Sequence, residues 1–161
     1  MSDHWQQRVD DLWARYDDIE PDDLVTRFEG LAAERPPGDP LALFELASAY
    51  DSTDHEAEAA PLYRAALTAG LTGLTRRRAV IQLASTLRNL GEAEECVALL
   101  TAERDMPSDE LDDAVAAFLA LALIDTGKPR AATSLALGAL SKHLPRYNRS
   151  LNTYAKAIKT E

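Results

Sequence analysis

The histidines and the cysteine are the residues most able to bind a metal ion or to act as a base or nucleophile. The three histidines, His4, His55 and His143, lie far apart, and no two have the i, i+4 spacing that places a pair on one metal ion. The single cysteine, Cys96, falls at a position expected to pack between helices, which favours a buried, inert thiol. We therefore expect solvated histidines and no metal site.

An acidic run could instead bind calcium: it contains Asp17, Asp18, Glu20, Asp22 and Asp23. The run lacks the glycine and the alternating ligands of a dedicated calcium loop. Its second half places anions at a helix start, where the helix dipole favours negative charge. Because no glycine-rich phosphate loop and no nucleophile elbow occurs either, we expect no catalytic residue and no cofactor. The protein is predicted not to be an enzyme, and an unrecognised active site is the remaining alternative.

Three cations, Arg76, Arg77 and Arg78, stand near an expected helix start, where the dipole disfavours positive charge. One interpretation pairs Arg76 and Arg77 with acidic residues of the N-terminal half as surface ion pairs. The other gives Arg78, together with Arg88, a role in gripping a ligand. The sequence leaves both interpretations open.

The charge of the chain argues against nucleic acid and anionic lipid as partners, because the net charge is −10 over 161 residues. This charge is unevenly spread: residues 1–60 carry a net −12, whereas residues 126–161 carry +6. The longest apolar run, residues 114–124, is shorter than the roughly 20 residues that cross a bilayer. The N-terminus lacks the apolar core of a signal peptide, and one cysteine cannot form an internal disulfide. We expect a soluble cytoplasmic protein.

One apolar template occurs three times along the chain, with lags of 37 and 36 residues. Each copy begins with residues at i, i+3, i+4 and i+7, which form one stripe of a helix: Leu43, Leu46, Ala47 and Tyr50; Val80, Leu83, Ala84 and Leu87; Ala116, Leu119, Ala120 and Leu123. A second stripe follows in each copy: Ala59, Tyr63 and Ala66; Cys96, Leu100 and Glu103; Ala132, Ala136 and Ala139. Each copy is therefore predicted to be a helical hairpin.

The residues between the two stripes are Asp54, Gly91 and Gly127, where a positive φ would end the first helix. Small residues at Ala47, Ala84 and Ala120 would let neighbouring backbones approach closely. Helix starts are predicted at Asp39-Pro40, at Thr75 and at Ser108.

The alternation of large, small and aromatic residues in these three copies resembles the tetratricopeptide repeat over residues 40 to about 142. The resemblance implies an all-α fold, a right-handed α-solenoid of antiparallel helix hairpins with about nine helices in a single domain. The expected boundaries are a divergent helix pair at 3–35, repeats at 39–70, 74–105 and 108–142, and a capping helix at 145–159. The apolar stripe of the first helix of this pair comprises Val9, Leu12, Trp13 and Tyr16, and its second helix should bury Leu24, Phe28, Leu31 and Ala32. The cap should pack through Tyr147, Leu151, Tyr154, Ala155 and Ile158.

In the family, first helices line a concave groove, and the resemblance implies that this groove binds a protein or peptide. The residues expected to line it are Phe44, Arg78, Gln82, Ser85, Arg88, Asn89, Phe118, Leu121 and Asp125. Some members grip a free C-terminus with Lys and Asn at set positions, which here read Phe44, Ser48, Ile81, Ser85, Ala117 and Leu121, so that clamp is absent.

The predicted function is that of a protein-binding adaptor. Two alternatives remain open: nucleic-acid contact through the basic tail, namely Lys142, Arg146, Arg149, Lys156 and Lys159, and association with a second copy of the chain.

Overall fold

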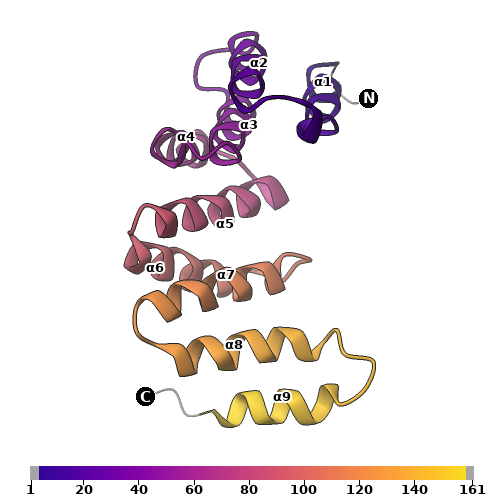
Figure 1. Cartoon of the computed structure of the whole chain (residues 1–161), viewed down its shortest axis with the longest axis vertical. Helices are drawn as coiled ribbons and strands as arrows, with labels where there is room; N and C mark the ends of the chain where they lie inside the picture. Colours follow the sequence, from indigo (N-terminus) through magenta and orange to yellow (C-terminus); the bar gives the residue numbers. More distant parts are fainter. Residues whose placement is uncertain (1–3, 159–161) are drawn as a thin grey trace. The chain divides into compact units, whose positions relative to one another are not determined.

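The computed structural model describes residues 4–158, which contain nine α-helices, one short 3-10 helix and no strand (Figure 1). The elements are α1 (His4–Trp13), η1 (Tyr16–Asp18), α2 (Pro21–Ala33), α3 (Pro40–Asp51), α4 (Glu56–Thr68), α5 (Gly73–Asn89), α6 (Ala93–Arg104), α7 (Asp112–Asp125), α8 (Pro129–Ser141) and α9 (Asn148–Ala157). The predicted all-α fold of helical repeats is confirmed. None of the helices in this part of the chain is long and apolar enough to cross a bilayer.

The chain forms two compact units, Met1–Thr86 (unit 1) and Leu87–Glu161 (unit 2), which divide inside α5. Within unit 1, α2 contacts both α1 and α3, and α3 contacts α4. Within unit 2, α6 contacts α7, α7 contacts α8, and α8 contacts α9, so that the last three helices lie side by side (Figure 1). Contacts between helices that are neighbours in the chain are typical of helical repeats. The single domain of the sequence analysis stays a prediction.

The N-terminal helix pair buries five of its predicted apolar residues: Val9, Leu12, Leu24, Phe28 and Leu31. Trp13 and Ala32 are half-buried, and Tyr16 is 39% exposed, which corrects its place in the apolar stripe. The indole of Trp5 adds a hydrogen bond from Nε1 to the carbonyl oxygen of Leu31, at 2.8 Å. The Trp13 ring packs against the Phe28 ring, with their centroids 4.6 Å apart. The pair therefore has a core of its own, which continues onto Ala42 and Ala49 of α3.

Small residues occur where the repeat template requires them. Ala47, Ala84 and Ala120 are buried, and so are the larger Tyr63 and Leu100 of the second helices. Small-to-large packing of this kind lets helix backbones approach without leaving cavities. The third copy departs from the pattern, because Ala136 is exposed on α8.

The turn inside each hairpin has the predicted left-handed residue: φ is 62° at Asp54, 86° at Gly91 and 75° at Gly127. The residue after each turn donates its backbone N–H to a carbonyl five residues earlier: His55 to Tyr50 (3.0 Å), Glu92 to Leu87 (2.8 Å) and Lys128 to Leu123 (2.7 Å). These bonds are those of the Schellman motif, which satisfies carbonyl groups at a helix end. The same cap therefore closes the first helix of all three hairpins.

Helix starts agree less well with prediction. Asp39 caps α3 as predicted, because its Oδ1 accepts a hydrogen bond from the backbone N–H of Ala42 at 2.9 Å. α5 begins at Gly73, two residues before Thr75. α7 begins at Asp112 rather than at Ser108, because residues 108–111 form a separate turn in which the Ser108 hydroxyl donates to Oδ2 of Asp112 at 2.5 Å.

Two of the residues predicted to pack the capping helix α9 are exposed instead. Ala155 is buried, and its carbonyl oxygen accepts a hydrogen bond from the Ser134 hydroxyl on α8 at 2.8 Å. Tyr147 and Tyr154, however, are 77% and 69% exposed. Tyr154 on α9 and Tyr147, which precedes the helix, therefore face solvent and do not pack against α8 as predicted. Lys159, predicted for the wet side of this helix, lies outside the described residues.

Candidate peptide-binding surfaces

In unit 1, α5 presents Arg78, Gln82 and Ser85 at successive turns. Arg78 is exposed, and its guanidinium carbon lies 5.2 Å from the centroid of the Phe44 ring on α3. A cation above a ring face is attracted by the ring quadrupole, so the phenyl group orients the arginine. Within the described chain, no carboxylate lies within 4.0 Å of this guanidinium, which leaves its N–H groups available to a ligand.

Gln82 is half-buried, and its side-chain oxygen Oε1 is removed from solvent without a hydrogen-bond donor among residues 4–158. A buried acceptor that lacks a donor costs about 1–3 kcal/mol. Ser85 follows one turn later and is also half-buried. An incoming N–H group could satisfy this acceptor only after the half-buried Gln82 side chain rotates Oε1 toward the surface of α5.

Phe44 itself has no exposed surface, which corrects its prediction as a groove-lining residue. Its neighbours on α3, Glu45 and Ser48, are buried as well. Helices in a repeat array contact neighbours on two sides, so residues flanking the apolar stripe are covered by the next contact. Phe44 supports Arg78 from below and does not itself meet a ligand.

A buried polar layer forms around α3. Trp13 donates from Nε1 to Oε2 of Glu45 at 2.7 Å, and the Thr86 hydroxyl of α5 donates to Oδ1 of Asp51 at 2.8 Å. The Tyr63 hydroxyl of α4 donates to the other oxygen of Asp51 at 3.3 Å. Residues from three helices, α1, α4 and α5, are thereby tied to α3, which fixes the position of this part of α5 within unit 1.

Burial has the largest effect on the pKa values of the two carboxyl groups in this layer. Desolvation raises the pKa of the Glu45 carboxyl, although the Trp13 hydrogen bond and the charge of Arg78 oppose the increase. Desolvation likewise raises the pKa of Asp51, against the hydrogen bonds from Thr86 and Tyr63. The charged forms of both carboxyl groups are therefore disfavoured in the folded protein.

In unit 2, Arg88 is engaged within the protein. Its Nε lies 2.5 Å from Oδ2 of Asp125 at the end of α7. Both side chains are about one third exposed, so the pair has contact with water. The geometry assigns Arg88 and Asp125 to each other, which differs from the expectation that Arg88 grips a ligand.

The remaining predicted residues of unit 2 form an apolar surface on α7. Phe118 is half-buried and Leu121 is 42% exposed, while Asn89 at the end of α5 is exposed. Ile124, which sequence reasoning missed, is 55% exposed one turn after Leu121. Its place as the last apolar residue before the hairpin turn was the signal that could have identified it. The nine predicted residues are divided between the two units, and one continuous groove stays a prediction.

The arginine cluster at the start of α5 is not uniform. Arg77 is only 3% exposed and Arg76 is half-buried, whereas Arg78 is exposed. Arg77 is thus an interior residue, which corrects its interpretation as a member of a surface ion pair. Of the three cations, Arg78 is the most accessible to a ligand.

Among residues 4–158, no cluster of three or more His, Cys, Asp or Glu side chains has an arrangement that could hold a metal ion. Cys96 is buried as predicted, and burial raises the pKa of its thiol to about 11. A thiol with this pKa carries very little thiolate at neutral pH.

Comparison with known protein families matches residues 40–158 to the tetratricopeptide repeat, described as "Tetratrico peptide repeat". The chain belongs to the tetratricopeptide repeat family. The match begins at α3 and extends through α9, so it leaves α1 and α2 outside and continues beyond the predicted limit near residue 142. Tetratricopeptide repeats are generally protein-interaction modules and are typically non-enzymatic. No curated protein and no solved structure gives a significant match to this chain.

Proposed function

We propose that this tetratricopeptide repeat protein is a cytoplasmic adaptor that binds an extended peptide segment of a partner through Arg78, Gln82 and Ser85 of α5. The observation that carries the proposal is the buried Oε1 of Gln82, which lacks a donor among the described residues. A backbone N–H of a bound peptide would supply that donor. Arg78 would donate to a peptide carbonyl or carboxylate, and the Ser85 hydroxyl can do either.

The spacing along α5 suits an extended chain. Arg78 and Gln82 are four residues apart, which corresponds to about 6 Å along a helix axis. Alternate residues of an extended peptide repeat every ~6.6 Å. Neighbouring polar groups of α5 would therefore meet successive backbone groups on one edge of the peptide.

Arg78 is also held ready for binding. Its position above the Phe44 ring restricts the rotamers of a side chain that would otherwise lose conformational entropy on binding. Preorganisation lowers this cost and so increases affinity.

The test is a selection of random peptides displayed on phage against the full-length chain, followed by affinity measurement on variants. Gln82→Leu and Arg78→Glu should each weaken the selected peptides by about tenfold or more, since each removes a charge-assisted or buried hydrogen bond. Arg104→Glu is the matched control, because Arg104 is exposed on α6 and has only a 3.7 Å contact with Asp105.

Selected peptides that bind Gln82→Leu and Arg78→Glu as tightly as the wild-type chain would refute this assignment. A selection that enriches no peptide would also count against it. Circular dichroism should show unchanged helix content in all three variants.

A further inference from the structure

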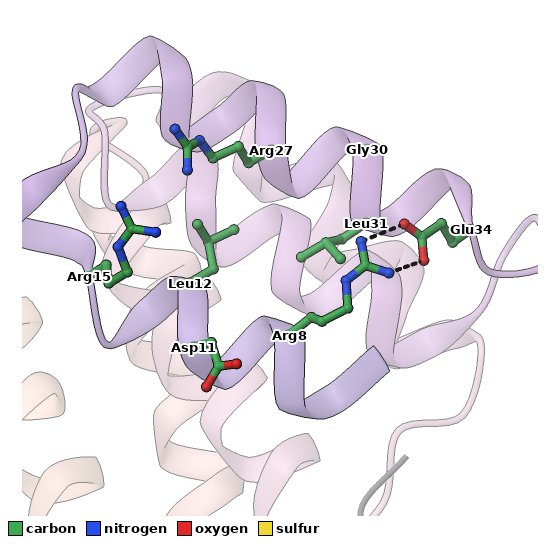
Figure 2. Close-up of a pocket in the computed structure, with 8 residues that line it drawn as sticks. All are labelled: Arg8, Asp11, Leu12, Arg15, Arg27, Gly30, Leu31 and Glu34. Atoms are coloured by element: carbon green, nitrogen blue, oxygen red, sulfur yellow. Dashed lines mark hydrogen bonds and ion pairs between the residues drawn. The ribbon is translucent and has the colours of Figure 1, made fainter. Parts of the chain in front are cut away.

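A pocket of about 400 Å³ opens in unit 1 between α1 and α2, outside the segment that matches the family (Figure 2). Its walls include Arg8, Leu12, Arg15, Arg27, Leu31 and Glu34. A volume of this size lies within the range of small-molecule sites. The pocket is separate from the α5 residues proposed above, so its role can be tested independently.

Two of the arginines in this pocket have no anionic partner among residues 4–158. No carboxylate of the described chain lies within 4.0 Å of Arg15 or Arg27, although residues 1–86 carry 16 acidic side chains against 8 arginines. Figure 2 shows both guanidinium groups on the same side of the pocket, with Arg15 before η1 and Arg27 on α2. Two accessible cations are therefore directed toward one space.

The third arginine shows how this pocket can hold a carboxylate. Arg8 donates from both terminal nitrogens to the two oxygens of Glu34, at 2.6 and 2.7 Å. Such paired hydrogen bonds are characteristic of arginine with a planar carboxylate. Arg8 is thereby neutralised within the protein, whereas Arg15 and Arg27 are not.

The rest of the pocket is suited to an apolar group. Leu12 and Leu31 lie between the charged walls, and Figure 2 shows them between the unpaired arginines and the Arg8–Glu34 pair. Gly30 on α2 adds space, because a Cβ built at this position would meet no atom within 4 Å. A ligand could therefore place a short hydrocarbon chain or a ring against the leucines.

The local charge selects a monoanion. Three arginines line the pocket together with two carboxylates, those of Asp11 and Glu34, so the wall carries a net +1. A carboxylate would neutralise this charge, whereas a phosphate dianion would leave an excess of negative charge. We propose that the α1–α2 pocket binds a small molecule that carries one carboxylate on an apolar body, with Arg15 and Arg27 holding the carboxylate.

The test is isothermal titration of the full-length chain with 4-phenylbutyrate, alongside 4-phenylbutanamide as its neutral analogue. We expect saturable one-to-one binding of the carboxylate and none of the amide. The double variant Arg15→Gln/Arg27→Gln should weaken binding by at least about tenfold, because two charge-assisted hydrogen bonds are lost. Arg104→Gln, an exposed arginine of unit 2, should bind like the wild-type chain.

A second variant separates loss of the pocket from loss of the fold. Gly30→Leu should fill the pocket and abolish binding, yet raise the melting temperature, since leucine favours a helix interior far more than glycine does. No saturable binding up to about 10 mM, a range that already detects very weak complexes, would overturn the proposal. Equal binding of the amide, or unchanged binding by the double variant or by Gly30→Leu, would overturn it as well. Loss of peptide binding at α5 would have no bearing on these outcomes.

Discussion

At the level of single residues, the buried Glu45 carboxyl is the clearest determinant of pH-dependent stability. Its pKa is raised in the folded state, chiefly by desolvation. The stabilisation linked to this group is therefore fully present below its unfolded pKa and is lost as the pH rises through its folded pKa. Asp51 acts in the same direction, for the same reason.

We predict that Glu45→Gln is more stable than the wild-type chain at neutral pH and that the difference shrinks as the pH falls through the folded pKa. Glutamine keeps an oxygen to accept the Trp13 hydrogen bond and removes the charge. Urea unfolding across this pH range measures the effect, with Glu94→Gln on the exposed start of α6 as control. A difference that did not vary with pH would contradict the explanation.

The Asp113 carboxyl changes the stability with pH in the opposite direction to Glu45, because its pKa is lowered in the folded state. Hydrogen bonds from Lys142 (2.6 Å) and His143 (2.9 Å), which follow α8, hold the pKa of this α7 carboxyl below its usual range. Its contribution is present above the unfolded pKa and is lost as the pH falls through the folded pKa.

We therefore expect Asp113→Asn to reduce the free energy of unfolding at neutral pH, by less than about 1 kcal/mol because the pair is on the surface. The reduction should vanish in acid. Urea unfolding at neutral pH and below the folded pKa measures it, and a larger loss in acid than at neutral pH would contradict the assignment.

Ala84 tests the small-residue requirement of the repeat. It is completely buried on α5, where no space exists for a larger side chain. We predict that Ala84→Leu destabilises the protein by about 1–3 kcal/mol through overpacking. Ala98→Leu, at an exposed position of α6, should change the stability by less than about 0.5 kcal/mol. Chemical denaturation measures the free energy of unfolding of both variants. Equal losses would contradict the requirement for a small residue at position 84.

At the level of elements, the three hairpin turns share one cap but not one residue type. Gly91 adopts φ 86° at no steric cost, and a Cβ there would meet no neighbour, so Gly91→Ala introduces only backbone strain. We expect that substitution to cost about 1–2 kcal/mol. Asp54 already bears such strain at φ 62°, and Asp54→Gly should be neutral or slightly stabilising. Thermal unfolding should show a lower melting temperature for Gly91→Ala and an unchanged or slightly higher one for Asp54→Gly. Equal losses in the two variants would contradict the conclusion that both turns require the same left-handed residue.

The α9 element bears on the alternative of nucleic-acid contact. Lys142 of the basic tail is occupied by Asp113. On α9, Tyr154 is two residues from Lys156 and five from Arg149, which places its side chain about 160° and about 140° from these two cations around the helix. Cations that track a nucleic-acid backbone work together with aromatic rings on one surface. This separation favours the protein-binding proposal.

Much of the architecture could be predicted because helix period and turn chemistry are local. The lag of 36 to 37 residues located three hairpins, the Ala47, Ala84 and Ala120 positions were correctly expected to be buried, and Asp54 was correctly aligned with two glycines. The side chains beside the apolar stripe could not be assigned in this way. Phe44 and Arg77 are buried, and the pattern along a single helix does not show what covers the residues beside its apolar stripe. The pocket at Arg15 and Arg27 depends on contact between α1 and α2, and neither arginine belongs to a repeat.

At the level of the whole molecule, the two compact units carry different features. Unit 1 contains the polar face of α5 and the α1–α2 pocket, whereas unit 2 contains the apolar surface of α7 and the exposed tyrosines of α9. Acidic residues are concentrated in residues 1–60 and basic residues in 126–161.

The central claim is that the unsatisfied polar face of α5 receives a peptide backbone. The most direct measurement is an amide NMR titration of the full-length chain with a selected peptide, observing the side-chain amide of Gln82. We predict that the Gln82 side-chain resonances and the backbone amides of residues 78–85 shift together and saturate at one equivalent. Saturable binding that leaves these resonances unmoved and shifts only those of α9 would contradict the claim.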